Sequence, residues 1–281
     1  MFSKQALKAG LISLLIFLAF VGAWSLATHQ KEGPAATGAD AEYAALMGKG
    51  ADKSSGFPPP SKVAESFAIY LADPFYDKGP NDKGIGIQLA HSLVRVGIGF
   101  LLAVAVALPL GFAIGMSPLL LQAFNPFIQI LKPISPLAWM PLALYSLKDS
   151  DISGIFVIFI CSLWPMLINT AFGVASVRRD WINVARTLEV GPLRKAFLVI
   201  LPAAAPTILT GMRISMGIAW LVIVAAEMLT GGVGIGFWVW DEWNNLKVEH
   251  IIIAIFVIGI VGLILEQALI LLARKLTKEA S

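Results

Sequence analysis

The sequence predicts an all-α membrane protein with about six transmembrane helices. Hydrophobic residues make up 57% of its 281 residues and charged residues only 14%, and the mean hydropathy is +0.78. A soluble domain carries about 25% charged residues, so most of this chain must face hydrocarbon or other helices. Several apolar stretches reach the roughly 20 residues that a membrane-crossing helix needs, and they lack the alternation of a membrane barrel.

The first apolar stretch lies within residues 1–28 and follows Lys4 and Lys8. This pattern fits a retained first span with a cytosolic amino end, or a cleaved signal peptide. The stretch is long for a signal peptide, so we predict a retained span. Five further spans are predicted at residues 86–115, 119–147, 153–177, 205–229 and 250–273.

Residues 29–84 are predicted to be an external linker followed by an amphipathic helix. The linker ends in the run Gly56 to Pro60, which favours an extended backbone. Ser61 is a candidate helix N-cap, and apolar residues then recur at helical spacing. The helix either lies at the membrane interface or helps to dock an external partner.

Prolines and glycines cluster in the second and third spans. The prolines predict either a broken pathway wall or simple kinks, because interrupted helices survive in lipid only where freed carbonyls are satisfied. Gly97, Gly99, Gly111 and Gly115 favour close helix packing. The prolines are Pro109, Pro118, Pro126, Pro133, Pro136 and Pro141.

Charge is distributed unequally between the predicted loops. With six spans and the amino end inside, the basic loop 178–202 and the tail 276–281 lie in the cytosol, and the acidic loops lie outside. This predicts a multi-pass protein of a bacterial inner membrane with both ends cytosolic. The net charge of +3 follows from this topology, and we expect no nucleic-acid partner.

The loop 178–202 is unusually long for an inner loop of this chain. Trp181, Val184, Ala185 and Leu188 recur at i, i+3, i+4 and i+7, which predicts a helix with one apolar stripe. Gly191 and Pro192 should end that helix, and a second should begin at Leu193. Two short helices of this kind would form a knob that a soluble partner could grip.

This loop resembles the coupling loop of type I ABC importer permeases. The family pattern is EAA, three residues, G, nine residues, I, one residue and LP. Glu189 stands at the place of the Gly, with Gly191 two residues later, so the bend is expected to shift. The other places are taken by Asn183, Val184 and Ala185 for EAA, Val199 for I, and Leu201 and Pro202 for LP.

The resemblance extends over residues 85–275, in strings such as SLVRVGIGFLLA, LKPISPLAWMPLAL and GGVGIGFWVWDEWN. It is greatest to the nitrate, sulfonate and taurine branch, and IFVIFICSLWPMLINTAFGV looks most like the nitrate and bicarbonate permeases. The resemblance implies the type I ABC importer permease fold with cytosolic coupling helices. It also implies a non-catalytic subunit that translocates a small anion, most nearly nitrate or nitrite, with bicarbonate, sulfonate or taurine as alternatives.

The same resemblance implies the partners. They are cytosolic ABC ATPase subunits that bind ATP and Mg, a second permease copy in a homodimer, a periplasmic or lipid-anchored substrate-binding protein, and membrane lipids. The chain has no GxxxxGK[ST] loop, so we expect it to bind no cofactor itself. No cluster of His, Cys or acidic residues predicts a metal site or an enzyme, and no repeated half predicts a stand-alone carrier.

Polar residues inside the spans are candidates for the translocation pathway, because charges cost several kcal/mol at membrane depth. Lys132 and Arg213 could each present a positive charge to an anion; Lys132 could instead snorkel, and Arg213 could pair with a carboxylate. Glu227 is interpreted as a structural partner or an outer gate, and Glu266 as an interhelical or lipid-edge group. For Asn169, an interhelical hydrogen bond is preferred over substrate contact.

Overall fold

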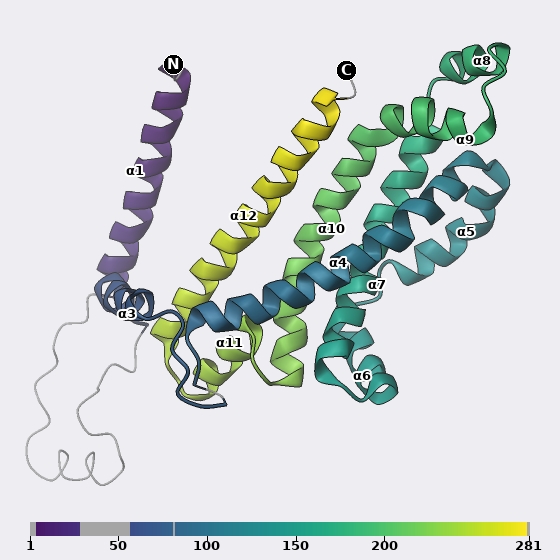
Figure 1. Ribbon diagram of the computed structural model, residues 1–281. Helices are drawn as coiled ribbons and strands as arrows, with labels where there is room; N and C mark the ends of the chain where they lie inside the picture. Colours follow the sequence, from purple (N-terminus) through teal and green to yellow (C-terminus); the bar gives the residue numbers. More distant parts are fainter. Residues whose placement is uncertain (1–3, 29–56, 81, 280–281) are drawn as a thin grey trace, which may run out of the picture. The chain divides into compact units, whose positions relative to one another are not determined.

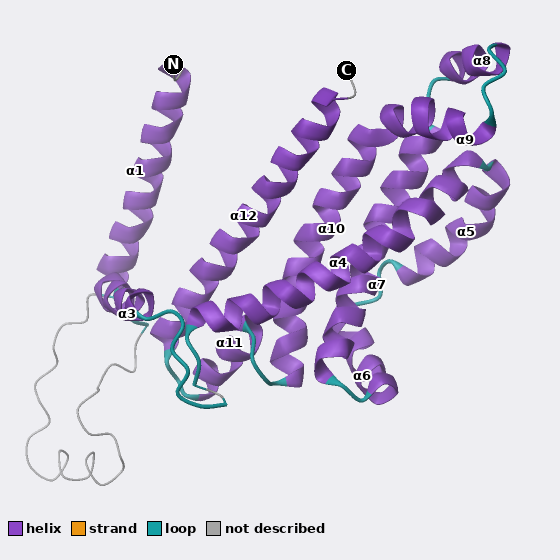
Figure 2. Ribbon diagram, viewed as in Figure 1, coloured by secondary structure: helices purple, strands orange, loops and turns teal. Residues whose placement is uncertain are grey.

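The computed structural model describes residues 4–28, 57–80 and 82–279, and this part of the chain is helical apart from its connecting turns and one isolated β-bridge (Figures 1 and 2). The helices are α1 (Lys4–Ala27), α3 (Pro60–Ala72), α4 (Ile85–Met116), α5 (Pro118–Leu131), α6 (Pro136–Leu147), α7 (Ser150–Ala175), α8 (Arg179–Thr187), α9 (Pro192–Lys195), the π-helix η1 (Ala196–Ile200), α10 (Leu201–Thr230), α11 (Ile235–Asn244) and α12 (Val248–Glu279).

Among the described residues, five helical stretches are long and apolar enough to cross a membrane, or six if the bent pair α5 and α6 counts as one span. The five are Leu7–Ala27, Ile85–Met116, Ser150–Ala175, Pro192–Thr230 and Val248–Lys275. This confirms the predicted all-α class with about six spans.

The bent pair is the interruption that the prolines predicted. Helices α5 and α6 meet at 91°. Pro133 in the corner has no N–H to continue the ladder, and the Ser135 hydroxyl caps the new helix by accepting the Leu137 N–H at 3.3 Å. Pro109, in contrast, lies inside the continuous helix α4, so it does not break the second span.

The chain divides into two compact units, residues 1–73 with 242–253 and residues 74–241 with 254–281. In the first unit, α3 is helical as predicted, but it starts at Pro60 with Pro59 as a cap that makes no side-chain bond, so the predicted cap Ser61 is wrong. A proline at the first helical position needs no donor, which explains the earlier start. The Tyr70 hydroxyl lies 3.1 Å from Nδ1 of His250 in the same unit.

The second unit has its core where α4, α7 and α10 pack together, with α7 in contact with both neighbours (Figure 1). Glycines permit the close approach. A Cβ at Gly99 would clash with Ile158, and one at Gly111 with Thr170 and the Leu167 carbonyl. The predicted packing role is therefore confirmed for these positions, whereas Gly97 has no neighbour within 4 Å.

Candidate functional site

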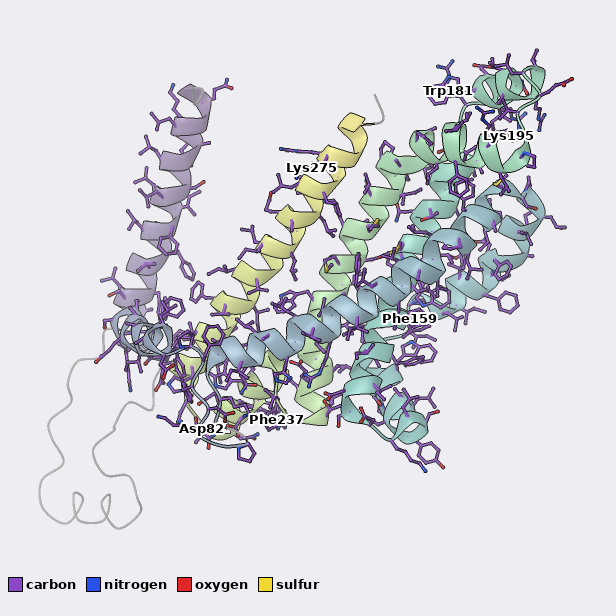
Figure 3. The ribbon with its side chains drawn as sticks, in the orientation of Figure 1. Asp82, Phe159, Trp181, Lys195, Phe237 and Lys275 are labelled. Atoms are coloured by element: carbon purple, nitrogen blue, oxygen red, sulfur yellow. The ribbon has the colours of Figure 1, made fainter. Side chains whose placement is uncertain are left out.

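The predicted coupling loop consists of α8, a short turn, α9 and η1, and it continues directly into α10. In Figure 3, Trp181 and Lys195 mark this segment, where α8 lies beyond the ends of α7 and α10. The loop is thus two helical pieces joined by a bend, as the pattern predicted.

Helix α8 is attached to the bundle by a narrow inward face. Ala185 is 3% exposed, and Ile182 packs against an apolar cluster at the adjoining ends of α7 and α10. The cluster consists of Val174, Val177, Ile200, Ala204 and Ile208. This cluster joins α8 to both helices.

The neighbouring face of α8 points away from the bundle and is apolar. Trp181 is 47% exposed, Val184 58% and Leu188 70%. The predicted stripe therefore divides into three exposed residues and the buried Ala185. Exposed apolar groups of this size on one short helix are typical of a contact surface rather than of a solvated knob.

The turn after α8 is a Schellman motif, with the Val190 N–H donating to the Ala185 carbonyl and the Glu189 N–H to the Arg186 carbonyl, both at 3.0 Å. Glu189 occupies the left-handed position of this motif with φ +53°, where glycine is favoured. The bend therefore lies at Glu189. The expected shift to Gly191 is wrong, because Gly191 has φ −54° and serves as the N-cap of α9.

The loop rejoins the membrane through a local π-turn. Pro202, near the start of α10, has no N–H to offer the Leu198 carbonyl, and the Leu201 N–H donates to the Ala196 carbonyl five residues earlier. The other predicted coupling residue, Asn183, is exposed on α8. Leu201 and Pro202 thus form the entry from the loop into α10.

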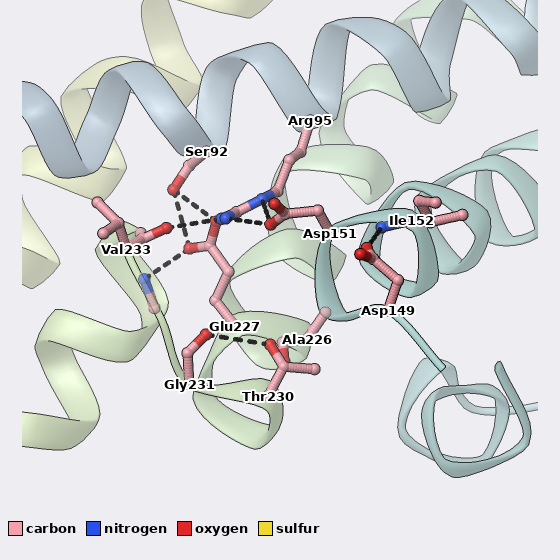
Figure 4. A network of polar contacts seen from close by, with 12 residues as sticks. Ser92, Arg95, Asp149, Asp151, Ile152, Ala226, Glu227, Thr230, Gly231 and Val233 are labelled. Atoms are coloured by element: carbon pink, nitrogen blue, oxygen red, sulfur yellow. Dashed lines mark hydrogen bonds and ion pairs between the residues drawn. The ribbon is translucent and has the colours of Figure 1, made fainter. Parts of the chain in front are cut away.

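A network of charged residues lies at the far end of α10 (Figure 4). Arg95 Nη1 donates to Glu227 Oε1 at 2.6 Å, and Nε donates to Asp151 Oδ1 at 2.9 Å. The Glu227 side chain is 3% exposed and that of Asp151 66%. Ser92 donates to both Glu227 oxygens at 2.8 Å. One guanidinium thereby joins α4, α7 and α10.

The same network holds the glycine-rich loop after α10. Gln88 Oε1 accepts the Gly234 N–H at 2.6 Å, Ser92 Oγ accepts the Ile235 N–H at 3.0 Å, and Glu227 Oε2 accepts the Gly236 N–H at 3.0 Å. Side chains at Gly234 or Gly236 would collide with Glu227 or the Val224 carbonyl. Glu227 is therefore a structural partner, one of its two predicted roles.

Arg95 is the residue that sequence reasoning missed. Gln88, Ser92 and Arg95 stand at i, i+4 and i+7 in a predominantly apolar helix, so they share one face. That polar stripe was the signal for a buried partner of Glu227.

Arg213 and Glu266 form an ion pair, with Nη2 donating to Oε1 at 2.8 Å. This is the alternative in which Arg213 pairs with a carboxylate. The pair borders a pocket of about 710 Å³ between α10 and α12, which Gly217, Trp220 and Gly262 also line. The charge of Arg213 is thus balanced at close range.

Lys132 and Asn169 have different surroundings. Lys132 is exposed at the C-terminal cap of α5, in the corner of the bent pair, and has no ion pair within the described part of the chain. Asn169 Nδ2 donates to the Pro165 carbonyl at 2.7 Å in its own helix, so the preferred interhelical hydrogen bond is wrong for this donor. Arg213, Glu227 and Asn169 thus bond to different partners, and none of them bonds to another predicted pathway residue.

The comparisons with known proteins agree with this fold and loop. Residues 102–278 match the family of binding-protein-dependent transport system inner membrane components. The nitrate import permease protein NrtB of Synechocystis sp. is 46% identical over 215 residues, which are 76% of this chain and 78% of that protein. The bicarbonate transport system permease protein CmpB of the same organism is 44% identical over 75% of this chain and 77% of its own length.

Among solved structures, the MetNI methionine ABC transporter in inward-facing conformations matches with a TM-score of 0.56 at 12% identity. The match covers 68% of this chain and 94% of that chain and shows a common fold.

Among the described residues, no group of three or more His, Cys, Asp or Glu side chains is placed to hold a metal. The family match and the relatives together show that the chain belongs to the binding-protein-dependent transport system inner membrane components, the non-catalytic, multi-pass permease subunits of type I ABC importers.

Proposed function

We propose that this chain is the permease of an ATP-driven nitrate importer and that α8 is the lever through which cytosolic ATPases move it. The observation that carries the proposal is the two-sided character of α8. Its outward face is apolar and exposed at Trp181, Val184 and Leu188, whereas on its inward face Ala185 is buried and Ile182 packs against the cluster at the ends of α7 and α10.

The mechanical step follows from this attachment. An ATPase dimer that closes on ATP draws α8 with it, and the apolar cluster under Ile182 carries the motion into α7 and α10. Packed helices respond as rigid bodies rather than by continuous bending. The helices therefore rock, and the pathway opens alternately to the two sides. ATP and Mg stay on the ATPases, and affinity resides in an external, periplasmic or lipid-anchored binding protein.

The proposed topology has residues 1–28 as the first span, 29–84 outside, 85–275 as the permease core, and 276–281 as a cytosolic tail, all in a bacterial inner membrane. Both ends and the coupling loop 178–202 are then cytosolic. The basic residues of this loop support that orientation. A second copy of the chain completes the pathway as a homodimer.

The hydrogen-bonding chemistry of Lys132 favours nitrate over bicarbonate. Among the predicted pathway cations, Lys132 is the one without an ion pair in the described residues. Lys132 offers only donors, and nitrate only accepts, whereas bicarbonate also needs an acceptor for its hydroxyl. The relatives named for nitrate and for bicarbonate are nearly equally similar. Arg213 and Asn169 are proposed to border the pathway, and Glu227 to hold its outer end.

The coupling proposal is tested by comparing Leu188→Glu with Leu246→Glu in the reconstituted transporter. Both leucines are exposed, but only Leu188 belongs to the coupling loop, as the C-cap of α8, and Leu246 belongs to a loop proposed to be external. In Leu188→Glu, the ATPase should no longer copurify with the permease, and nitrate should no longer stimulate ATP hydrolysis. The reason is that the new carboxylate would lose its water in the contact between α8 and the ATPase. Leu246→Glu should retain the ATPase. Equal retention in both variants would refute the lever.

The substrate is tested separately, by uptake of labelled nitrate into proteoliposomes that contain the permease, its ATPases and its binding protein. Unlabelled nitrate should compete fully, and bicarbonate, taurine and sulfonates should not. Full competition by bicarbonate, with weak competition by nitrate, would transfer the assignment to the bicarbonate alternative.

A further inference from the structure

A pocket of about 560 Å³ lies beneath α8, outside the apolar face assigned to the ATPase contact. Three parts of the second unit enclose it: the junction of α4 and α5 at residues 115–121, the end of α7 at residues 174–177, and the coupling loop. Its volume is within the roughly 300–1,000 Å³ range of small-molecule sites. No role has been assigned to it so far.

The pocket is positively charged. Arg179, Arg186 and Lys195 line it, and no carboxylate does. Arg179 and Arg186 are seven residues apart, which places them two turns apart on one side of α8. The nearby acid Asp180 is engaged elsewhere, with Arg178 at 3.0 Å. Within the described part of the chain, none of the three lining cations forms an ion pair, so their positive potentials add in the pocket.

Apart from Asn183, the remaining lining side chains are apolar, with Met116, Leu121, Val177, Ile182 and Ile200 among them. Next to it, Leu119 at the start of α5 is 76% exposed. A small free oxyanion would use the cations but gain nothing from the apolar wall. A phospholipid would use both, with its phosphate on the cations and its glycerol and upper acyl carbons against the wall.

We propose that this pocket binds the headgroup of an anionic phospholipid from the cytosolic leaflet, and that the lipid secures α8 to the ends of α4 and α7. The assignment to the cytosolic leaflet rests on the proposed function, since that is what places the loop 178–202 inside. Basic pockets between helices at this leaflet are suited to anionic headgroups. The bound lipid would position α8 for coupling.

The test uses the full-length permease in detergent and measures binding of phosphatidylglycerol and phosphatidylcholine by native mass spectrometry. Arg186→Gln is compared with Arg194→Gln. Both arginines are exposed and lie in the same loop, but only Arg186 lines the pocket. Each lining cation that is removed should weaken phosphatidylglycerol binding about fivefold, so Arg186→Gln with Lys195→Gln should weaken it about 25-fold. Arg194→Gln should bind like the wild type.

Three outcomes would overturn the proposal. The first is an equal loss of phosphatidylglycerol affinity in Arg186→Gln and Arg194→Gln, and the second is equal binding of the two lipids. The third is displacement of the lipid by millimolar inorganic phosphate or nitrate, which would assign the pocket to a free anion. Lys195→Arg keeps the positive charge and should bind phosphatidylglycerol with the affinity of the wild type. Thermal unfolding of each variant checks that Lys195→Arg and Lys195→Gln are equally well folded. Lipid binding is measured without ATPases or transport, so failure of the lever proposal would leave this result intact, and the reverse also holds.

Discussion

Arg95 Nη1 lies 2.6 Å from Glu227 Oε1 and joins α4 to α10 at the end opposite the coupling loop. Glu227 is 26 positions after Leu201, or about 39 Å along the helix. Helix α10 is therefore held at one end by a buried ion pair and at the other by the apolar cluster under α8. A force on α8 acts on a helix whose far end is fixed, which favours rocking over translation.

Removal of Arg95 should be far more costly than removal of its exposed partner. Arg95→Gln leaves Glu227 buried without its cation, and such losses cost about 3–5 kcal/mol. Asp151 touches the same guanidinium but is solvent-exposed, so Asp151→Asn should cost at most about 1 kcal/mol. Thermal unfolding of the purified permease measures both. A double variant, Arg95→Gln with Glu227→Gln, should recover much of the lost stability, and strict additivity of the two single losses would argue against the pair.

The left-handed conformation of Glu189 leads to a second prediction. Glu189→Gly should stabilise the end of α8 by about 1 kcal/mol, because glycine adopts φ +53° without steric cost. Hydrogen exchange of the Glu189 and Val190 amides, which close the Schellman motif, measures the change. Gly191→Ala is the control, since Gly191 has φ −54° and no neighbour within 4 Å of an added Cβ. Unchanged exchange in Glu189→Gly would contradict the motif.

Much of the fold could be predicted because its signals are local. Apolar runs mark the spans, and Pro133 and Pro136 mark the corner between α5 and α6. The family pattern locates the coupling loop by spacing even where letters differ. The bend after α8 was not located correctly: the sequence suggested Gly191, but the hydrogen bonds at the end of α8 place the left-handed residue at position 189, although its side chain is that of a glutamate.

The ion pairs could not be predicted in the same way. Arg213 and Glu266 are 53 positions apart, and Arg95 and Glu227 are 132 apart. A single sequence says which side chains need a partner at membrane depth, but the choice of partner depends on how helices are packed and rotated. The role of Lys132 could not be predicted either, because the structure gives it no partner among the described residues.

Helix packing between α4 and α7 should be sensitive to one added methyl group. Gly111→Ala would push a Cβ against Thr170 and the Leu167 carbonyl, and overpacking of this kind costs about 1–3 kcal/mol. Gly97→Ala, in the same helix but facing open space, should be neutral or slightly stabilising. Thermal unfolding of the two variants in one detergent compares them. Equal stability would mean that α4 and α7 are not in close contact at Gly111.

The role of Lys132 can be separated from general membrane anchoring by a second lysine on the same bent pair. Lys132 caps α5 and Lys148 caps α6, and both are exposed. If Lys132 attracts the passing anion, Lys132→Gln should lower nitrate transport about fivefold, the effect of about 1 kcal/mol of attraction across a few ångströms of water. Lys132→Arg should preserve transport, and Lys148→Gln should leave it unchanged. A lysine that only snorkels to headgroups predicts equal, small losses at both positions, so initial uptake rates in proteoliposomes distinguish the two interpretations.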